Sequence, residues 1–176
     1  MKFIKIKTIV LICTVLFSSN IFAQITKVEI IASGLTCSMC SNAINKQLKT
    51  LTEVDSVTTD LNTNTFVVYL KKDNKLKPRV LKEMVEKAGF FIGSLVITIP
   101  SDIFKSNANN TVSLDGSTYI IVNDKKKKPN GDIKARIYDK GYVTKKEYKK
   151  LLKALSKTET YLLHNEDDYH IKIINQ

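Results

Sequence analysis

The stretch Gly34–Ile44, GLTCSMCSNAI, holds two cysteines three positions apart, Cys37 and Cys40, where one sequence pattern gives way to another. Before it, the alternation of ITKVEIIA (25–32) predicts a half-buried strand. After it, apolar residues recur every three or four positions over 43–51, which predicts an amphipathic helix. A cysteine pair at such a turn can bind a metal ion, exchange electrons as a disulfide or brace the fold.

Four further elements extend this unit to Ile99. Two β-branched runs, VDSVTTDL and TFVVYLK, are joined through NTN, which predicts a hairpin. Pro78 opens a second helix, Gly89 is placed to end it, and GSLVITI supplies a last strand. The order β-α-β-β-α-β predicts the ferredoxin-like arrangement, with two helices on one face of an antiparallel sheet. The predicted fold class is therefore α+β.

A polar break at residues 100–110 predicts a linker, and residues 111–176 predict a small C-terminal domain whose role the sequence does not indicate. Its expected order is β-β-β-α-β-β, with Thr144 and Glu147 as a capping box for the helix. The last two strands, TYLLH and YHIKII, are expected to pair as a hairpin across NEDD. This order suits either a small barrel of the oligonucleotide/oligosaccharide-binding kind or another α+β unit.

Residues 1–23 have the pattern of a secretory signal peptide. Three lysines precede an apolar run of about ten residues, and small and polar residues end at Ala23; spanning a bilayer takes roughly 20 apolar residues. We therefore expect export to the periplasm or the medium, and a first domain over 24–99. Removal of the leader lowers the formal charge from +11 to +8 and leaves Cys37 and Cys40 as the remaining cysteines.

The position of the pair favours thiolate chemistry. Cys40 is expected in the first turn of the helix, where the positive end of the helix dipole favours the thiolate, and Cys37 lies on the preceding loop. Thiolates are soft ligands that suit Cu(I), whereas a closed structural zinc site needs four ligands. The pair therefore indicates an open, two-ligand site for a soft ion.

Gly34, Thr36, Cys37 and Cys40, on this order of elements, resemble the G-M-T-C-x-x-C signature of the heavy-metal-associated domain family. That family includes copper chaperones, the N-terminal modules of metal-pumping ATPases and a periplasmic mercury-binding protein. The resemblance covers about residues 25–99. It implies that Cys37 and Cys40 are the metal ligands and that Cu(I) is the ion, with Hg(II), Zn(II) or another thiophilic ion as alternatives. It further implies a partner that donates or accepts the metal, either a protein or a transporter.

Three other positions follow from the same resemblance. Phe90, in KAGF, matches an aromatic residue that shields the metal loop. Leu35 stands where the family has methionine, and its similar size preserves packing under the loop. Met39 has a thioether that could bind metal, but the family varies at this position, so we do not expect it to be a ligand.

The competing functions use the same cysteines. A thiol-disulfide oxidoreductase of the thioredoxin type would resemble W-C-x-x-C with a cis-proline opposite the pair, and this chain has no tryptophan. A structural Cys37–Cys40 disulfide would close too short a loop to restrain much of the unfolded chain. An interaction module with such a bridge is the third possibility. Neither a nucleophile-and-base motif nor a phosphate loop is recognisable, so we do not expect an enzyme.

Two charged segments mark the C-terminal unit. DKKKKPNGD (124–132) is expected to be a solvated hairpin tip, with docking on an acidic protein or membrane surface open and nucleic-acid binding disfavoured by export. HNEDDYH gathers His164, His170 and three carboxylates, which could form a second metal site. The plainer interpretation is the turn of the last expected hairpin, where acidic residues are common and histidines occur by chance; alternation does not fix the faces of the two histidines. The sequence does not indicate an oligomeric state.

Overall fold

The structure, a computed structural model, describes residues 24–35, 38–101, 103, 110–122 and 131–174. The predicted signal peptide and Cys37 lie outside these residues. Within them, no helix is long and apolar enough to cross a membrane. The elements in chain order are β1 (Lys27–Ser33), α2 (Ser38–Leu48), β2 (Val54–Asp60), β3 (Thr65–Leu70), α3 (Pro78–Lys87), β4 (Phe91–Pro100), β5 (Thr111–Leu114), β6 (Ser117–Ile121), β7 (Asp132–Ile137), α5 (Lys145–Ala154), α6 (Glu159–Leu163) and β8 (Asp168–Ile174).

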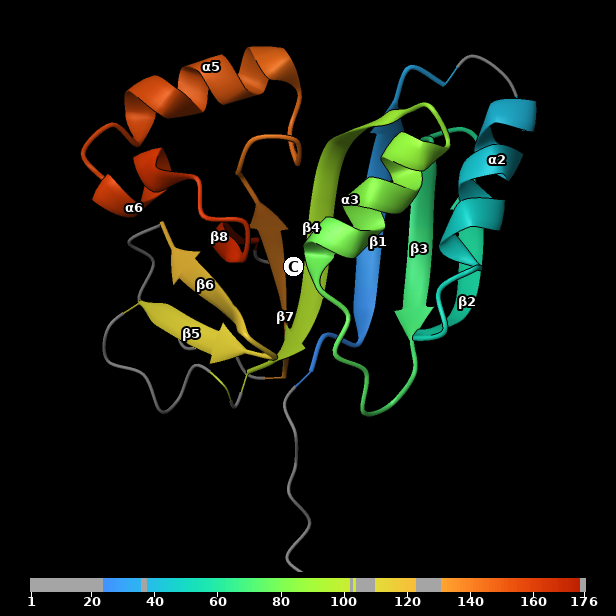
Figure 1. Cartoon of the computed structure of the whole chain (residues 1–176), viewed down its shortest axis with the longest axis horizontal. Helices are drawn as coiled ribbons and strands as arrows, with labels where there is room; N and C mark the ends of the chain where they lie inside the picture. Colours follow the sequence, from blue (N-terminus) through green and yellow to red (C-terminus); the bar gives the residue numbers. More distant parts are fainter. Residues whose placement is uncertain (1–23, 36–37, 102, 104–109, 123–130, 175–176) are drawn as a thin grey trace, which may run out of the picture.

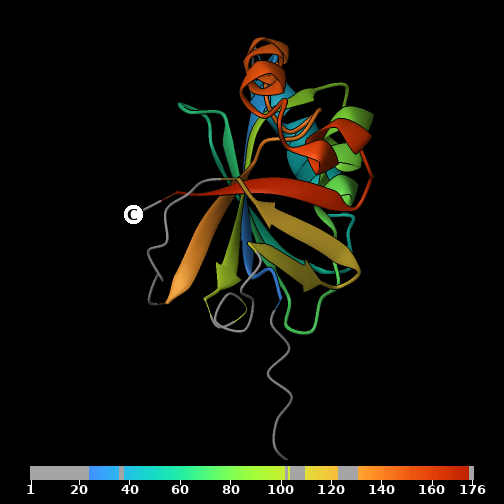
Figure 2. The same cartoon turned by 90° about the vertical axis from the view of Figure 1, so that its left-hand side faces the viewer.

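The described strands form one eight-stranded sheet in the order β2-β3-β1-β4-β7-β8-β6-β5 (Figure 1). The predicted α+β class is confirmed. The strands of the C-terminal unit continue this open sheet, which fits the α+β alternative for that unit and not the barrel. The turned view in Figure 2 shows the twist of the sheet, since β8 runs across the direction of β1.

The N-terminal half has the predicted ferredoxin-like order. β1 pairs antiparallel with both β3 and β4, and its alternation buries Val28, Ile30 and Ala32 on the face that α2 and α3 cover (Figure 1). α3 begins at Pro78, as predicted, because a first-turn proline loses no intrahelical hydrogen bond. Gly89 follows the helix with a φ of +87°, which glycine adopts without strain.

β4 joins the two halves of the molecule. Its far edge pairs antiparallel with β7, which places Val96 opposite Arg136. Lys134 of β7 reaches over β4 to Glu29 of β1, with 2.9 Å between Nζ and Oε1. Pairing on both edges makes β4 a central strand, and Ile97–Ile99 are accordingly buried in succession. The C-terminal unit is thus built onto the edge that β4 would otherwise expose.

Two predictions for the C-terminal unit are wrong. TYLLH forms the short helix α6 instead of a strand, and β8 pairs in parallel with β6 and antiparallel with β7 instead of closing a hairpin. A helical turn buries Tyr161 alone and leaves Leu162 and Leu163 in solvent, a pattern that strand alternation does not produce. Most of the lysine-rich segment 124–132, which the sequence analysis expected to be a hairpin tip, lies outside the described residues. The strands on either side of it, β6 and β7, are not neighbours in the sheet, because β8 lies between them.

Buried tyrosines connect the C-terminal strands to α3. Tyr169 stacks on Tyr119 with 5.3 Å between ring centroids and meets Tyr142 edge-on at 5.7 Å. All three rings belong to the same hydrophobic cluster as Ile30 of β1 and Leu81 of α3. The two halves therefore share one core.

Candidate metal-binding site

The turn from β1 into α2 is fixed by backbone geometry and by its neighbours. Gly34 has a φ of +89°, in the left-handed region that favours glycine, and a Cβ at this position would meet no atom within 4 Å among the described residues beyond its two chain neighbours. Glycine is therefore favoured at this position by the backbone conformation and not by steric contact with a neighbouring residue. Ser33 Oγ donates to the carbonyl of Phe91 at 3.2 Å, and the amide of Ala32 donates to the carbonyl of Asn64 at 3.3 Å. These bonds fix the end of β1 against the neighbouring segments.

Cys40 is the third residue of α2 and is half-buried. The sequence-based prediction of its place in the first helical turn is confirmed, and the thiol lies near the positive end of the helix dipole. α2 is held on the sheet by Ser41, Ile44 and Leu48, all of which are buried. Cys37, the second predicted ligand, lies outside the described residues. The structure thus places Cys40, one of the two predicted ligands, on a helix that is anchored by buried residues.

The residues around the pair divide into packed and exposed groups. Leu35 and Phe90 are half-buried and pack against the main core, so the packing role expected of Leu35 is confirmed. The shielding role of Phe90 stays a prediction. Met39 is 81% exposed, as a variable loop position would be.

Phe91 is a feature that the sequence analysis missed. It lies opposite Ser33 in the register of β1 and β4 and is 64% exposed, at the end of the sheet where the cysteine loop begins. The sequence contained a signal for this position. In the pair FF, Phe90 ends the turn after α3 and Phe91 begins the strand, whose next residue, Ile92, is buried. Because neighbouring residues of a strand point to opposite faces, Phe91 is exposed.

The two histidines do not form a metal site. His170 is buried; its Nδ1 is 2.8 Å from Asp139 Oδ1 and its Nε2 is 2.9 Å from Thr160 Oγ1, so both ring nitrogens are occupied. His164 is exposed and ends α6 in a left-handed conformation beside the ring of Tyr148. Over the part of the chain that the structure describes, no three His, Cys, Asp or Glu side chains are grouped for metal binding.

A cleft of about 270 Å³ lies between α3 and the C-terminal unit, and Cys40 does not line it. Basic residues Arg79, Lys82 and Lys140 line this cleft, as do acidic residues Glu83 and Glu166. Lys82 Nζ lies 5.6 Å from the ring centroid of Tyr142, at the distance of a cation–π contact. The mixed lining gives the cleft no single sign of charge.

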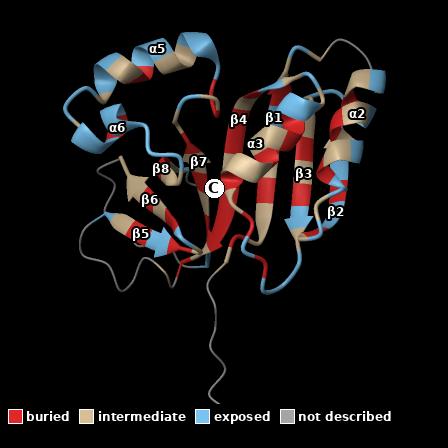
Figure 3. Ribbon diagram, viewed as in Figure 1, coloured by how far each residue is buried: buried red, intermediate tan, exposed pale blue. Residues whose placement is uncertain are grey.

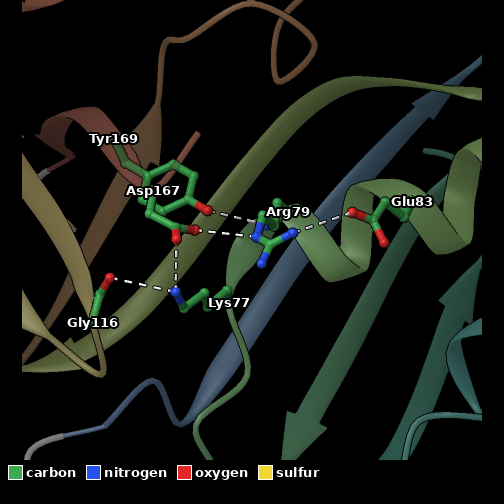
Figure 4. Close-up of polar contacts among 6 residues, drawn as sticks. All are labelled: Lys77, Arg79, Glu83, Gly116, Asp167 and Tyr169. Carbon is green, nitrogen blue, oxygen red and sulfur yellow. Dashed lines mark hydrogen bonds and ion pairs between the residues drawn. The ribbon is translucent and has the colours of Figure 1, made fainter. Parts of the chain in front are cut away.

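Beside the cleft, an ion-pair network ties α3 to the loop before β8 (Figure 4). Asp167 accepts from Lys77 Nζ at 2.7 Å and from Arg79 Nε at 3.2 Å, and the Arg79 amide donates to the Tyr169 hydroxyl at 3.3 Å. The hydrogen bond from Lys77 lowers the pKa of Asp167 against the opposing effect of partial desolvation. Burial raises the pKa of Tyr169 to about 12, and its hydroxyl oxygen accepts this bond. These contacts hold the start of α3 against the C-terminal unit.

Comparison with known proteins shows which family the N-terminal unit resembles. The sequence profile of the heavy-metal-associated domain matches residues 29–91, from β1 to the first residue of β4. No curated protein matches significantly. The match supports metal binding by the N-terminal unit.

Solved structures show the same kind of similarity. The yeast copper transporter domain Ccc2a is 37% identical over 37% of this chain and 88% of that domain, with a TM-score of 0.34. The complex of Atx1, Cu(I) and Ccc2a is 35% identical over 41% and 93%, with a TM-score of 0.34. The N-terminal soluble domains of CopA from Bacillus subtilis are 17% identical over 88% and 97%, with a TM-score of 0.37.

Proposed function

Because residues 29–91 make this chain a member of the heavy-metal-associated domain family, we propose that it binds a soft metal ion between the thiolates of Cys37 and Cys40. The observation that carries the proposal is the position of Cys40 in the first turn of α2, within the matched region and directly after the glycine turn. The thiolate is the form of cysteine that binds a soft metal ion.

Cu(I) is the ion that this ligand set suits best. Two thiolates are soft ligands, and a two-coordinate site matches Cu(I) better than an ion that needs four ligands or oxygen donors. Hg(II) would fit the same pair, and Zn(II) would need further ligands. The partial exposure of Cys40 supports a site at the surface, where a partner's ligand can reach the ion.

The ion then passes on by ligand exchange. An incoming thiolate or thioether from a partner adds to the bound ion and gives a three-coordinate intermediate, after which one cysteine of this chain leaves. The other cysteine leaves in a second exchange, so the ion keeps its charge and no electron is transferred. Cys40 suits this order, because its place on α2, a helix anchored by buried residues, lets its sulfur hold position during the first exchange. The chain acts as a carrier and not as an enzyme.

The partner is a protein or transporter that donates or accepts the metal. Export by the residue 1–23 signal would place the exchange outside the cytoplasm. There the chain would scavenge the ion or deliver it.

Competition for Cu(I) tests this proposal. The reduced chain from Gln24 onward, which holds every residue that the structure describes, is titrated anaerobically against a chromophoric chelator. Cys37→Ser/Cys40→Ser removes both thiols, and Met39→Leu is the matched control, since it changes the exposed residue between them. We expect one-to-one binding in the wild type and the control, and loss of binding in the double variant. Equal Cu(I) binding by the double variant would contradict the proposal.

A further inference from the structure

The outer side of α5 is a surface of lysines that the proposed metal site does not use. We call it the lysine face, and it consists of Lys145, Lys146, Lys149, Lys150 and Lys153. All five residues are exposed, and Figure 3 shows the exposed positions along the helix. At about 100° of rotation per residue, the five side chains fall within about 140° of the helix circumference. They therefore form one continuous surface.

The described part of the chain supplies no ion-pair partner to this face. Glu147, the one acidic residue of α5, points to Arg136 of β7, with 2.8 Å between its Oε2 and the arginine Nη2. Among the described residues, none of the five lysines makes an ion pair. The opposite side of the helix packs on Tyr161 through Leu151 and its neighbours, so the two sides have separate roles.

This arrangement works against the stability of the helix. Lys145 and Lys149 are four positions apart, as are Lys146 and Lys150, and like charges at that spacing repel. Lys145 and Lys146 also lie in the first turn, where the helix dipole disfavours cations. A helix selected for stability alone would mix glutamates into this face. The uncompensated charge indicates a partner outside the chain.

We propose that the lysine face docks the protein on a membrane surface rich in anionic lipid headgroups. Protein interfaces are depleted in lysine and rely on aromatic and arginine residues seated in pockets, whereas this face is a convex row of lysines. Lysines on flexible stems suit a fluid array of headgroups, and each one near an anionic surface adds to the attraction. The proposal does not depend on metal binding at Cys37 and Cys40.

Vesicle binding tests it, with the chain from Gln24 onward and phosphatidylcholine vesicles prepared with and without phosphatidylglycerol. The test variant is Lys146→Gln/Lys149→Gln/Lys153→Gln, in which glutamine keeps the helix propensity. The control, Lys71→Gln/Lys72→Gln/Lys75→Gln, removes the same charge from three exposed lysines in the loop before α3.

We expect the wild type and the control to bind the phosphatidylglycerol vesicles and to be released by salt. The α5 variant should bind roughly tenfold to a hundredfold more weakly. Its urea midpoint should not fall, because the substitutions relieve repulsion. Equal weakening of both variants would overturn the proposal, since net charge alone would explain binding. Absence of vesicle binding, with α5-dependent binding of polyglutamate, would also overturn it and would assign the face to an acidic protein.

Discussion

Gly34 sets the direction of the chain as it leaves β1 for the cysteine loop. Its φ of +89° lies in the left-handed region, where a Cβ clashes with the following carbonyl. Gly34→Ala should therefore lower the free energy of unfolding by about 1 kcal/mol, measured by urea denaturation. Gly34→Asn is the matched control and should lose less, because asparagine tolerates this conformation. If Gly34→Ala were as stable as the wild type, the left-handed backbone conformation of Gly34 would not be the reason that glycine occupies this turn.

Tyr161 anchors α6 to β7 through a single hydroxyl. Its ring is buried, and the hydroxyl donates to the carbonyl of Tyr138 at 2.7 Å. Tyr161→Phe keeps the ring and leaves that carbonyl without its partner, so we expect a loss of about 1 kcal/mol in the free energy of unfolding. Tyr69→Phe, at a 42% exposed position, is the control and should change it little. Equal stability of both variants would contradict this role.

At the residue scale, the sequence predicted positions that depend on local chemistry. The family signature predicted the place of Cys40 in the helix and the packing of Leu35. Both depend on the residues within a few positions of the turn, which a short motif contains. It did not predict the role of His170, whose ring binds Asp139 and Thr160, residues that are 31 and 10 positions away. These contacts depend on which strands β8 pairs with. Local sequence patterns give no information on that pairing.

The α5 helix is fixed at its start by a side-chain cap. Thr144 Oγ1 accepts from the backbone amide of Glu147 at 3.2 Å, as the predicted capping box requires. Thr144→Ala should lower the free energy of unfolding by about 1 kcal/mol. Thr158→Ala is the matched control, because Thr158 stands at the same position of α6 without a side-chain cap bond. Similar losses in both variants would show that the cap bond is not the cause.

At the element scale, only half of the capping box is formed. The second bond, in which the Thr144 backbone amide would donate to the Glu147 carboxylate, is not found among the described residues; that carboxylate accepts from Arg136 Nη2 at 2.8 Å instead. A tertiary ion pair replaced a local contact that the sequence pattern favoured. The same competition explains α6: TYLLH is short enough to be read as a strand or as a helix, and burial of Tyr161 decides between them.

Asp167 links α3 to the loop before β8, and its ionisation should affect the stability of the whole molecule. Its folded pKa is lowered from the usual 3.8, chiefly by the Lys77 hydrogen bond. The stabilisation is therefore fully present above that value and is lost as the pH falls through the folded pKa. Asp167→Asn should lower the free energy of unfolding by about 1 kcal/mol at neutral pH, since the pair is partly solvated.

Urea denaturation from neutral pH to below pH 4 measures this dependence. The difference between the wild type and Asp167→Asn should shrink as the pH falls below 4. Glu166→Gln, which changes the exposed neighbouring carboxylate, should not show this dependence. A difference that stays constant over this range would contradict the role of ionised Asp167.

At the scale of the whole molecule, the sequence predicted two units and their elements but not the single sheet that joins them. One signal pointed to it: β4 holds three apolar residues in succession, Leu95–Ile97, as in a central strand, whereas an edge strand would alternate. The partner strand could not be identified from alternation, since β5, β6 and β7 all show it. Only the register between Val96 and Arg136 and the ion pair of Lys134 with Glu29 select β7.

X-ray absorption on the Cu(I)-loaded chain tests the central claim most directly, because it identifies the atoms bound to the metal. The account predicts a first shell of two sulfurs, unchanged in Met39→Leu and lost in Cys37→Ser/Cys40→Ser. A first shell of nitrogen or oxygen atoms, or a sulfur shell that survives removal of both cysteines, would contradict it.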